Sequence, residues 1–141
     1  MKYLLDTNVI SELQKSHCHP RIKLFLETID SQDMYLSVIT FGELCYGIEK
    51  LSISKKKHDL SIWLYAKLPE WFNKRIIDID TEVILEWGRI RSKARRTLPV
   101  LDTMIAASAI ANRMILVTRN TKDYEDIEGI KLLNPWEQHI P

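Results

Sequence analysis

The chain has 141 residues, of which 45% are hydrophobic and 28% charged, and its formal net charge is +1 at pH 7. This length suits one domain with its own core, and the composition excludes disordered, fibrous and low-complexity classes. Asp6 interrupts the short apolar start of the chain. The sequence therefore predicts no signal peptide and no membrane span, and we expect a single cytoplasmic domain over residues 1–141.

Short apolar segments alternate with helical patterns along the chain. The segments that predict strands are Tyr3–Leu5, Met34–Val38, Arg75–Ile79, Ile115–Thr118 and Ile130–Leu133. Helical spacing is found in Val9–Leu13, Ile22–Thr28, Thr40–Leu51, Lys57–Leu68, Thr81–Arg96 and Thr103–Asn112, with a short turn at Lys122–Ile127. Such alternation is typical of an α/β fold, in which a mainly parallel sheet of about five strands is flanked by helices through right-handed crossovers.

Four acidic residues stand near the ends of these predicted elements. Asp6 follows the first strand, Glu43 lies near the start of a helix, Asp102 precedes a helix, and Asp123 follows the fourth strand. Because parallel strands bring their carboxyl ends to one edge, where open α/β sheets bind ligands, we expect these carboxylates to line one pocket. Like charges and burial both raise carboxyl pKa values. The pattern therefore favours a bound Mg²⁺ or Mn²⁺, which are hard ions that prefer oxygen ligands.

Each acid taken alone also has a structural explanation. Asp102 could cap a helix by accepting hydrogen bonds from free backbone N–H groups, and Glu43 could lie in a first helical turn, where the helix dipole favours negative charge. Asp6 differs in degree, because Asp6-Thr7-Asn8 places a carboxylate, a hydroxyl and an amide in one tight loop directly after a strand.

The segments around the four acids resemble the motifs of PIN-domain ribonucleases, particularly the VapC-type and FitB-like toxins of bacterial toxin–antitoxin pairs. In chain order the motifs are Leu4–Leu13, Ser37–Leu44, Leu98–Ala107 and Leu116–Tyr124, and Leu133–Trp136 resembles the closing strand and exit. Four motifs in the correct order outweigh the separate capping explanations. Two departures are that Tyr124 stands where the family often has Phe, and that Arg96-Thr97 lacks the Gly frequently seen before Leu98.

The resemblance implies a metal-dependent endoribonuclease, a hydrolase that serves as the toxin of a toxin–antitoxin pair. It implies that Asp6, Glu43, Asp102 and Asp123 are catalytic and bind Mg²⁺ or Mn²⁺, with hydrogen-bonding support from Asn8, Thr118 and Asn120. A carboxylate-held ion can orient the scissile phosphate and promote ionisation of a water, so no side-chain nucleophile is required. RNA is the expected substrate, a cognate antitoxin the expected protein partner, and a homodimer the expected assembly. Apolar residues at helical spacing could supply part of the subunit surface: Val9, Ile10, Leu13, Leu44, Ile48 and Leu51.

Nucleic-acid binding has to come from local charge, since the net charge is near zero. Arg89, Lys93 and Arg96 recur at helical neighbour spacing and could contact RNA phosphates. The alternative is a solvated helix face paired with Glu82 or Glu86. Four tryptophans could stack bases or belong to the core or an interface, and these are Trp63, Trp71, Trp87 and Trp136.

Two other function classes compete with the nuclease. A Mg²⁺-dependent phosphohydrolase would also place an Asp after the first strand, but its common Asp-x-Asp pattern is broken here by Asn8. A non-catalytic binding module would use the acids only as helix caps, which the presence of all four motif acids argues against. An RNA cleavage assay with Mg²⁺ or EDTA, run beside a phosphatase substrate, separates these classes.

Overall fold

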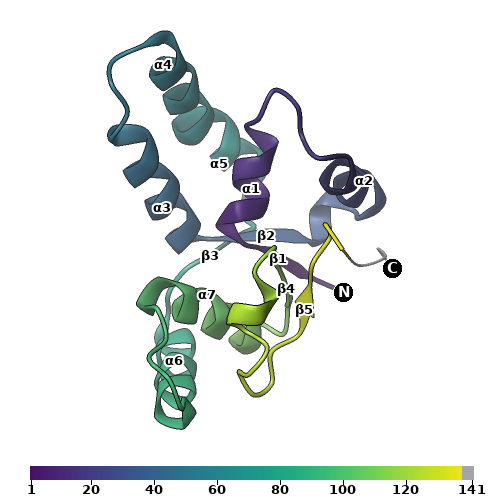
Figure 1. Ribbon diagram of the computed structural model, residues 1–141, viewed down its shortest axis with the longest axis vertical. Coiled ribbons are helices and arrows are strands. Elements are labelled where there is room, and N and C mark those ends of the chain that lie inside the picture. The colour runs from purple at the N-terminus through teal and green to yellow at the C-terminus, as the bar shows by residue number, and fades with distance from the viewer. Residues whose placement is uncertain (138–141) are drawn as a thin grey trace.

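A five-stranded parallel sheet forms the centre of the computed structural model, which describes residues 1–137 (Figure 1). The strands are β1 (Tyr3–Leu5), β2 (Met34–Ser37), β3 (Ile76–Ile77), β4 (Ile115–Val117) and β5 (Leu132–Leu133). Their order in the sheet is β3-β2-β1-β4-β5, and every pairing is parallel. This confirms the predicted α/β class. The order reverses at β1, so the carboxyl ends of β1 and β4 flank the point where such sheets bind ligands.

The helices cover both faces of this sheet. They are α1 (Thr7–Leu13), α2 (Pro20–Thr28), α3 (Val38–Glu49), α4 (Lys55–Ile62), α5 (Leu68–Trp71), α6 (Thr81–Lys93) and α7 (Val100–Ala111). A π-helical turn at Trp63–Lys67 joins α4 to α5, and 3-10 turns lie at Ser31–Asp33 and Thr121–Asp123. Figure 1 shows α1 to α5 on one side of the sheet and α6 and α7 on the other.

Several helix boundaries differ from the sequence-based prediction for identifiable reasons. α1 and α3 begin earlier than predicted, because the side chains of Asp6 and Ser37 accept hydrogen bonds from the first turns. The predicted helix Lys57–Leu68 is instead α4, the π-helical turn and α5, with Pro69, which lacks an N–H, near the start of α5. α6 ends at Lys93, because the backbone at Ala94 is extended.

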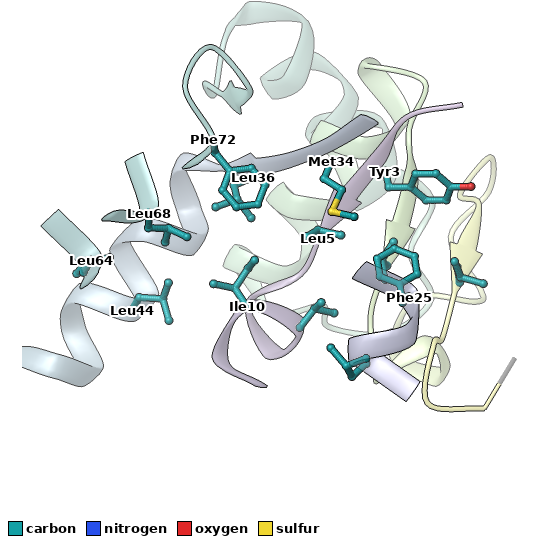
Figure 2. Packing of buried hydrophobic residues seen from close by; sticks show 14 of the residues in the cluster. Tyr3, Leu5, Ile10, Phe25, Met34, Leu36, Leu44, Leu64, Leu68 and Phe72 are labelled. Atoms are coloured by element: carbon teal, nitrogen blue, oxygen red, sulfur yellow. The ribbon is translucent and has the colours of Figure 1, made fainter. Parts of the chain in front are cut away.

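Side-chain alternation on β1 divides the core into two clusters. Leu5 lies in the cluster beneath α1, α2 and α5, which includes Ile10 and Phe25 (Figure 2). Leu4 points to the opposite face and lies in the cluster with Ile105 of α7. Both leucines are fully buried, so β1 is fixed from both sides. Asp6 follows β1 directly, so its position is fixed by the burial of this strand.

Four of the six apolar residues considered for a subunit surface lie in this core. Val9 and Ile10 are fully buried, and Leu44 and Ile48 are at most 9% exposed. The helical spacing of these four marks the faces of α1 and α3 that pack on the sheet and on each other, whereas Leu13 and Leu51 are half-buried. The large hydrophobic side chains that α6 and α7 leave exposed are Ile84, Leu85, Val100 and Leu101.

Within residues 1–137, no helix is both long and apolar enough to cross a membrane.

Candidate active site

Asp6 lies at the junction of β1 and α1 and is only 5% exposed. Its backbone N–H donates to the carbonyl of Val117 at 2.9 Å, which continues the β1–β4 pairing and brings Thr118 beside it. The Thr118 hydroxyl donates to Asp6 Oδ2 at 2.7 Å, and the Thr7 backbone N–H donates to Asp6 Oδ1 at 2.8 Å. Both carboxylate oxygens of Asp6 therefore have fixed donors.

Glu43 is tied to the same loop through Thr7. The Thr7 hydroxyl donates to Glu43 Oε1 at 2.6 Å, and the hydroxyl of Thr40 lies 3.1 Å from that of Thr7. Glu43 lies in the second turn of α3, and the first turn of that helix contains no acidic residue. Stabilisation by the helix dipole therefore does not explain Glu43, because the dipole effect is confined to the first turn.

Asp102 lies in the first turn of α7, but it is not the capping residue, which is Pro99. Burial raises the pKa of Asp102, and the negative charge of Asp123 raises it further. Asp123 belongs to the exposed 3-10 turn that follows β4. Asp102 and Asp123 are thus electrostatic neighbours although they come from different elements.

Electrostatic coupling joins Asp6 to two of the other acids. Burial raises the pKa of Asp6 most, and the charges of Asp102 and Glu43 raise it further, whereas the hydrogen bonds from Thr118 and Thr7 oppose this shift. Asp6 and Asp102 therefore lie at the same end of the sheet, as the sequence predicted. The carboxylates at this edge combine negative charge with hard oxygen ligands, which suits a divalent cation.

The supporting residues form a short hydrogen-bonded chain behind Asp6. The Asn8 side-chain amide donates to the Thr118 hydroxyl at 3.3 Å, and the Asn120 backbone N–H donates to the same hydroxyl at 3.1 Å. The Asn8 side-chain oxygen also accepts from the backbone N–H of Arg119 at 3.3 Å. Asn120 therefore acts here through its backbone, whereas Asn8 and Thr118 act through their side chains.

Tyr124 is the site residue that sequence reasoning did not identify as one. Its side chain is 2% exposed, and its hydroxyl donates to Asp6 Oδ2 at 3.4 Å. Burial and then the charges of Asp6 and Asp102 raise its pKa, which keeps the hydroxyl protonated, and its hydrogen bond lowers the pKa of Asp102. The available signal was the departure from Phe at this position, because tyrosine, unlike phenylalanine, can donate a hydrogen bond to the carboxylates.

The four carboxylates are less closely gathered than the sequence led us to expect. Within the described part of the chain, no three His, Cys, Asp or Glu side chains are grouped closely enough to hold a metal ion. Asp6 and Glu43 are instead held by hydroxyl donors from Thr118 and Thr7, and Asp123 is exposed. For the four carboxylates to bind one ion, some of their side chains would have to rotate. Glu43 and Asp102 are partly exposed, which leaves them room to do so.

The basic residues proposed for RNA binding each pair with an acidic side chain. Arg89 lies 2.7 Å from Glu86, Lys93 lies 3.2 Å from Glu128, and Arg96 lies 3.0 Å from Asp126. Arg96 also lies beyond the end of α6, so the helical spacing that linked it to the other two does not hold. A hollow of about 550 Å³ adjoins these residues, and none of the four motif acids lines it. This arrangement favours the alternative of a solvated, ion-paired face.

A parallel α/β sheet with a buried Asp at the carboxyl end of its first strand and three further acids at that edge is the architecture of a PIN-type domain. Residues 3–129 match the model of the PIN domain family, and the chain belongs to that family. It is 34% identical over 136 residues to the toxin FitB of Neisseria gonorrhoeae, covering 94% of this chain and 97% of FitB. It is 33% identical over 138 residues to the tRNA(fMet)-specific endonuclease VapC of Salmonella typhimurium, covering 94% of this chain and 96% of that protein.

Solved structures give the same assignment. The structure superposes on a chain of the N. gonorrhoeae FitAB complex bound to a DNA fragment with a TM-score of 0.90 at 32% identity. The match covers 97% of each chain. It also superposes on a chain of the DNA-bound VapBC complex of Salmonella typhimurium with a TM-score of 0.77 at 28% identity, covering 96% of this chain and 98% of that one. Both neighbours match nearly the whole of this chain.

Proposed function

We propose that this chain is a metal-dependent endoribonuclease and the toxin of a toxin–antitoxin pair. The observation that carries the proposal is the buried Asp6, whose carboxylate is held by Thr118 and Thr7 beside two further acidic side chains. Within residues 1–137 the Asp6 carboxylate forms no salt bridge and is only 5% exposed, so it is costly to keep ionised, which supports a role in binding a cation. Relatives named as a toxin and as a tRNA endonuclease support RNA as the substrate class.

In this proposal the four acids would hold Mg²⁺ or Mn²⁺, and they are Asp6, Glu43, Asp102 and Asp123. When bound, the ion would supply Lewis acidity toward the phosphate and would lower the pKa of a water molecule. The protein's own residues fix the ligands. Thr118 and Thr7 restrict rotation of the Asp6 carboxylate, the Thr7 hydroxyl holds Glu43, and the Tyr124 hydroxyl lies between Asp6 and Asp102.

No histidine-activated hydroxyl is found beside the acids within the part of the chain that the structure describes. The hydroxyls beside the acids belong to Thr7, Thr40, Thr118 and Tyr124, and each donates to or accepts from a neighbour. No histidine lies among the hydrogen-bond partners of Asp6 within the described residues. Attack by water is therefore the route that this set of side chains supports, and the acids rather than a covalent residue would carry the catalysis.

The proposal includes a cognate antitoxin and a homodimer. Solved neighbours of this chain include a toxin–antitoxin complex and FitAB and VapBC complexes, three of which are bound to DNA. An antitoxin could inhibit by inserting an Arg or Lys side chain among the acids, where it would pair with Asp6 or Asp102 in place of a metal ion. Inhibition would then weaken as Mg²⁺ is raised while the antitoxin stays bound. Activity that does not respond to Mg²⁺ in the intact complex would indicate blockage of the RNA path instead.

The function is tested by incubating the purified chain with total RNA in Mg²⁺, in Mn²⁺ and in EDTA, beside a generic phosphatase substrate. We expect discrete RNA fragments with either metal, none in EDTA, and no phosphatase activity. Asp6→Asn should abolish cleavage, whereas the matched control Asp59→Asn, an exposed position on α4, should cleave like the wild type. Cleavage that persists in EDTA, or in Asp6→Asn, would refute the proposal. Phosphatase activity without RNA cleavage would favour the phosphohydrolase class.

A further inference from the structure

Arg119 is an exposed cation on the loop that follows β4. It follows Thr118, whose hydroxyl donates to Asp6, and its own backbone N–H donates to Asn8. Its backbone carbonyl accepts from the Asn134 side-chain amide at 3.2 Å. Both backbone groups of Arg119 are thus held, one by Asn8 of α1 and the other by Asn134 after β5, so the loop does not depend on the guanidinium for its conformation.

The guanidinium of Arg119 lies over an aromatic ring rather than beside a carboxylate. Its central carbon is 5.3 Å from the centroid of the Trp136 ring. Arg119 is exposed, and no salt bridge joins it to an acidic side chain within residues 1–137. Arginine carries five N–H donors in a planar fork, which suits bidentate contact with a phosphate.

Trp136 is itself fixed in place. Its backbone N–H donates to the Asn134 side-chain oxygen at 2.9 Å, and its half-buried ring lies 6.5 Å from the ring of His19. A cation over an aromatic face is attracted by the ring quadrupole. The indole therefore restricts the guanidinium to the region over its ring, which reduces the conformational entropy that is lost when a ligand binds.

We propose that Arg119, positioned by Trp136, is a contact for an RNA phosphate adjoining the scissile position. The substrate class rests on the function proposed above. The contact addresses an electrostatic problem, because a polyanion must approach an edge that carries Asp6, Asp102 and Asp123, and a guanidinium on the loop that contains Thr118 offsets that repulsion. Arg89 illustrates the contrast, since its charge is already paired with Glu86.

The test is RNA binding measured separately from cleavage. A fluorescent single-stranded RNA is titrated with the full chain in Ca²⁺ over a range of salt concentrations, and a gel confirms that the RNA stays intact. Arg119→Ala should weaken binding roughly tenfold, and should flatten the slope of log K against log salt by about 0.7. Arg119→Lys keeps the charge but not the planar fork of donors, so its RNA affinity should lie between those of the wild type and Arg119→Ala. Lys56→Ala removes one exposed charge on α4 and is the matched control, which should bind like the wild type.

A double-mutant cycle tests the role assigned to the indole. Trp136→Leu should weaken RNA binding in the wild-type background but should have little further effect in Arg119→Ala, because the ring acts through the guanidinium. An equal loss in both backgrounds would mean that Trp136 stacks on a base directly, which would overturn its positioning role. Arg119→Ala binding within twofold of the wild type with an unchanged salt slope would overturn the phosphate contact.

The two proposals fail in different ways. A wild-type chain that binds RNA through Arg119 but never cleaves it with Mg²⁺ or Mn²⁺ would refute the nuclease function and leave the contact standing. A chain that cleaves RNA equally well with and without Arg119, at unchanged KM and salt dependence, would refute the contact alone. Loss of antitoxin binding in Arg119→Ala, without any loss of RNA binding, would reassign the residue to the protein partner and overturn the inference.

Discussion

Replacing Thr118 with Val should destabilise the metal-free protein in a pH-dependent way. The Thr118 side chain is fully buried, and its hydroxyl donates to Asp6 Oδ2 at 2.7 Å. Valine has nearly the same shape but cannot donate, so the ionised carboxylate loses a partner. A hydrogen bond to a charged group contributes about 1.5–3 kcal/mol, and we expect a loss of about 2 kcal/mol at pH 7.5. For a chain of this length that loss lowers Tm by about 5–10 °C.

The pH dependence follows from the raised pKa of Asp6. Burial raises that pKa, the Thr118 hydrogen bond lowers it, and the variant should therefore raise it further. An acid whose pKa is higher in the folded state destabilises the fold as pH rises through that pKa, because the folded state holds the proton longer. The penalty of Thr118→Val should be full above the raised pKa of Asp6. It should shrink as pH falls through the raised pKa, because a protonated Asp6 no longer loses a charged hydrogen bond.

The assay is thermal and urea unfolding in EDTA between pH 4.5 and 7.5. Ser108→Ala is the matched control, since the Ser108 hydroxyl is also fully buried but donates to the neutral carbonyl of Met104 at 2.8 Å. We expect it to cost about 1 kcal/mol, with no dependence on pH. A Thr118→Val penalty below about 0.5 kcal/mol, or one that stays constant across the pH range as in the control, would refute the reasoning.

Three further predictions concern the acids and the basic segment. Asp6→Asn should abolish cleavage and should raise Tm in EDTA at neutral pH, with a gain that fades toward acid pH. An early-melting variant with wild-type cleavage would contradict both parts. Mg²⁺ should raise the Tm of the wild type, since binding only the folded state stabilises it, and an equal rise in an Asp6→Asn, Asp102→Asn variant would mean that the ion binds elsewhere. The sequence predicted that Arg89, Lys93 and Arg96 bind RNA, but their ion pairs lead us to expect only a small rise in KM in the triple alanine variant. If RNA binding by this triple variant depended much less on salt than that of the wild type, at unchanged kcat, the RNA-binding role would be restored.

Much of the fold could be predicted from local pattern. Short apolar runs alternating with helical spacing indicated a parallel α/β sheet, and the strands lie within the predicted segments. The four acids could be found in the same way, because each falls in a motif of fixed residue types. What local pattern misjudged was the position of a residue within its helix, because helix starts depend on caps. Asp6 and Ser37 moved the starts of α1 and α3, which placed Glu43 beyond the reach of the helix dipole.

Other features were decided only by tertiary structure. The helical spacing of Val9, Ile10, Leu44 and Ile48 does not reveal whether an apolar face meets the core or another subunit, and packing on the sheet settled it for the core. The charge on Lys93 likewise gave no sign of its partner Glu128, which comes from a distant loop.

The hydrogen bonds of the site belong to this second group as well. Thr7 and Glu43 are 36 positions apart, and Tyr124 lies 118 positions from Asp6. They meet because parallel pairing brings the carboxyl ends of β2, β1 and β4 to one edge. The sequence alone determined which side chains carry the chemistry, since residue type is local. The register of the sheet decided which of them touch, because contacts between distant residues depend on how the strands pair.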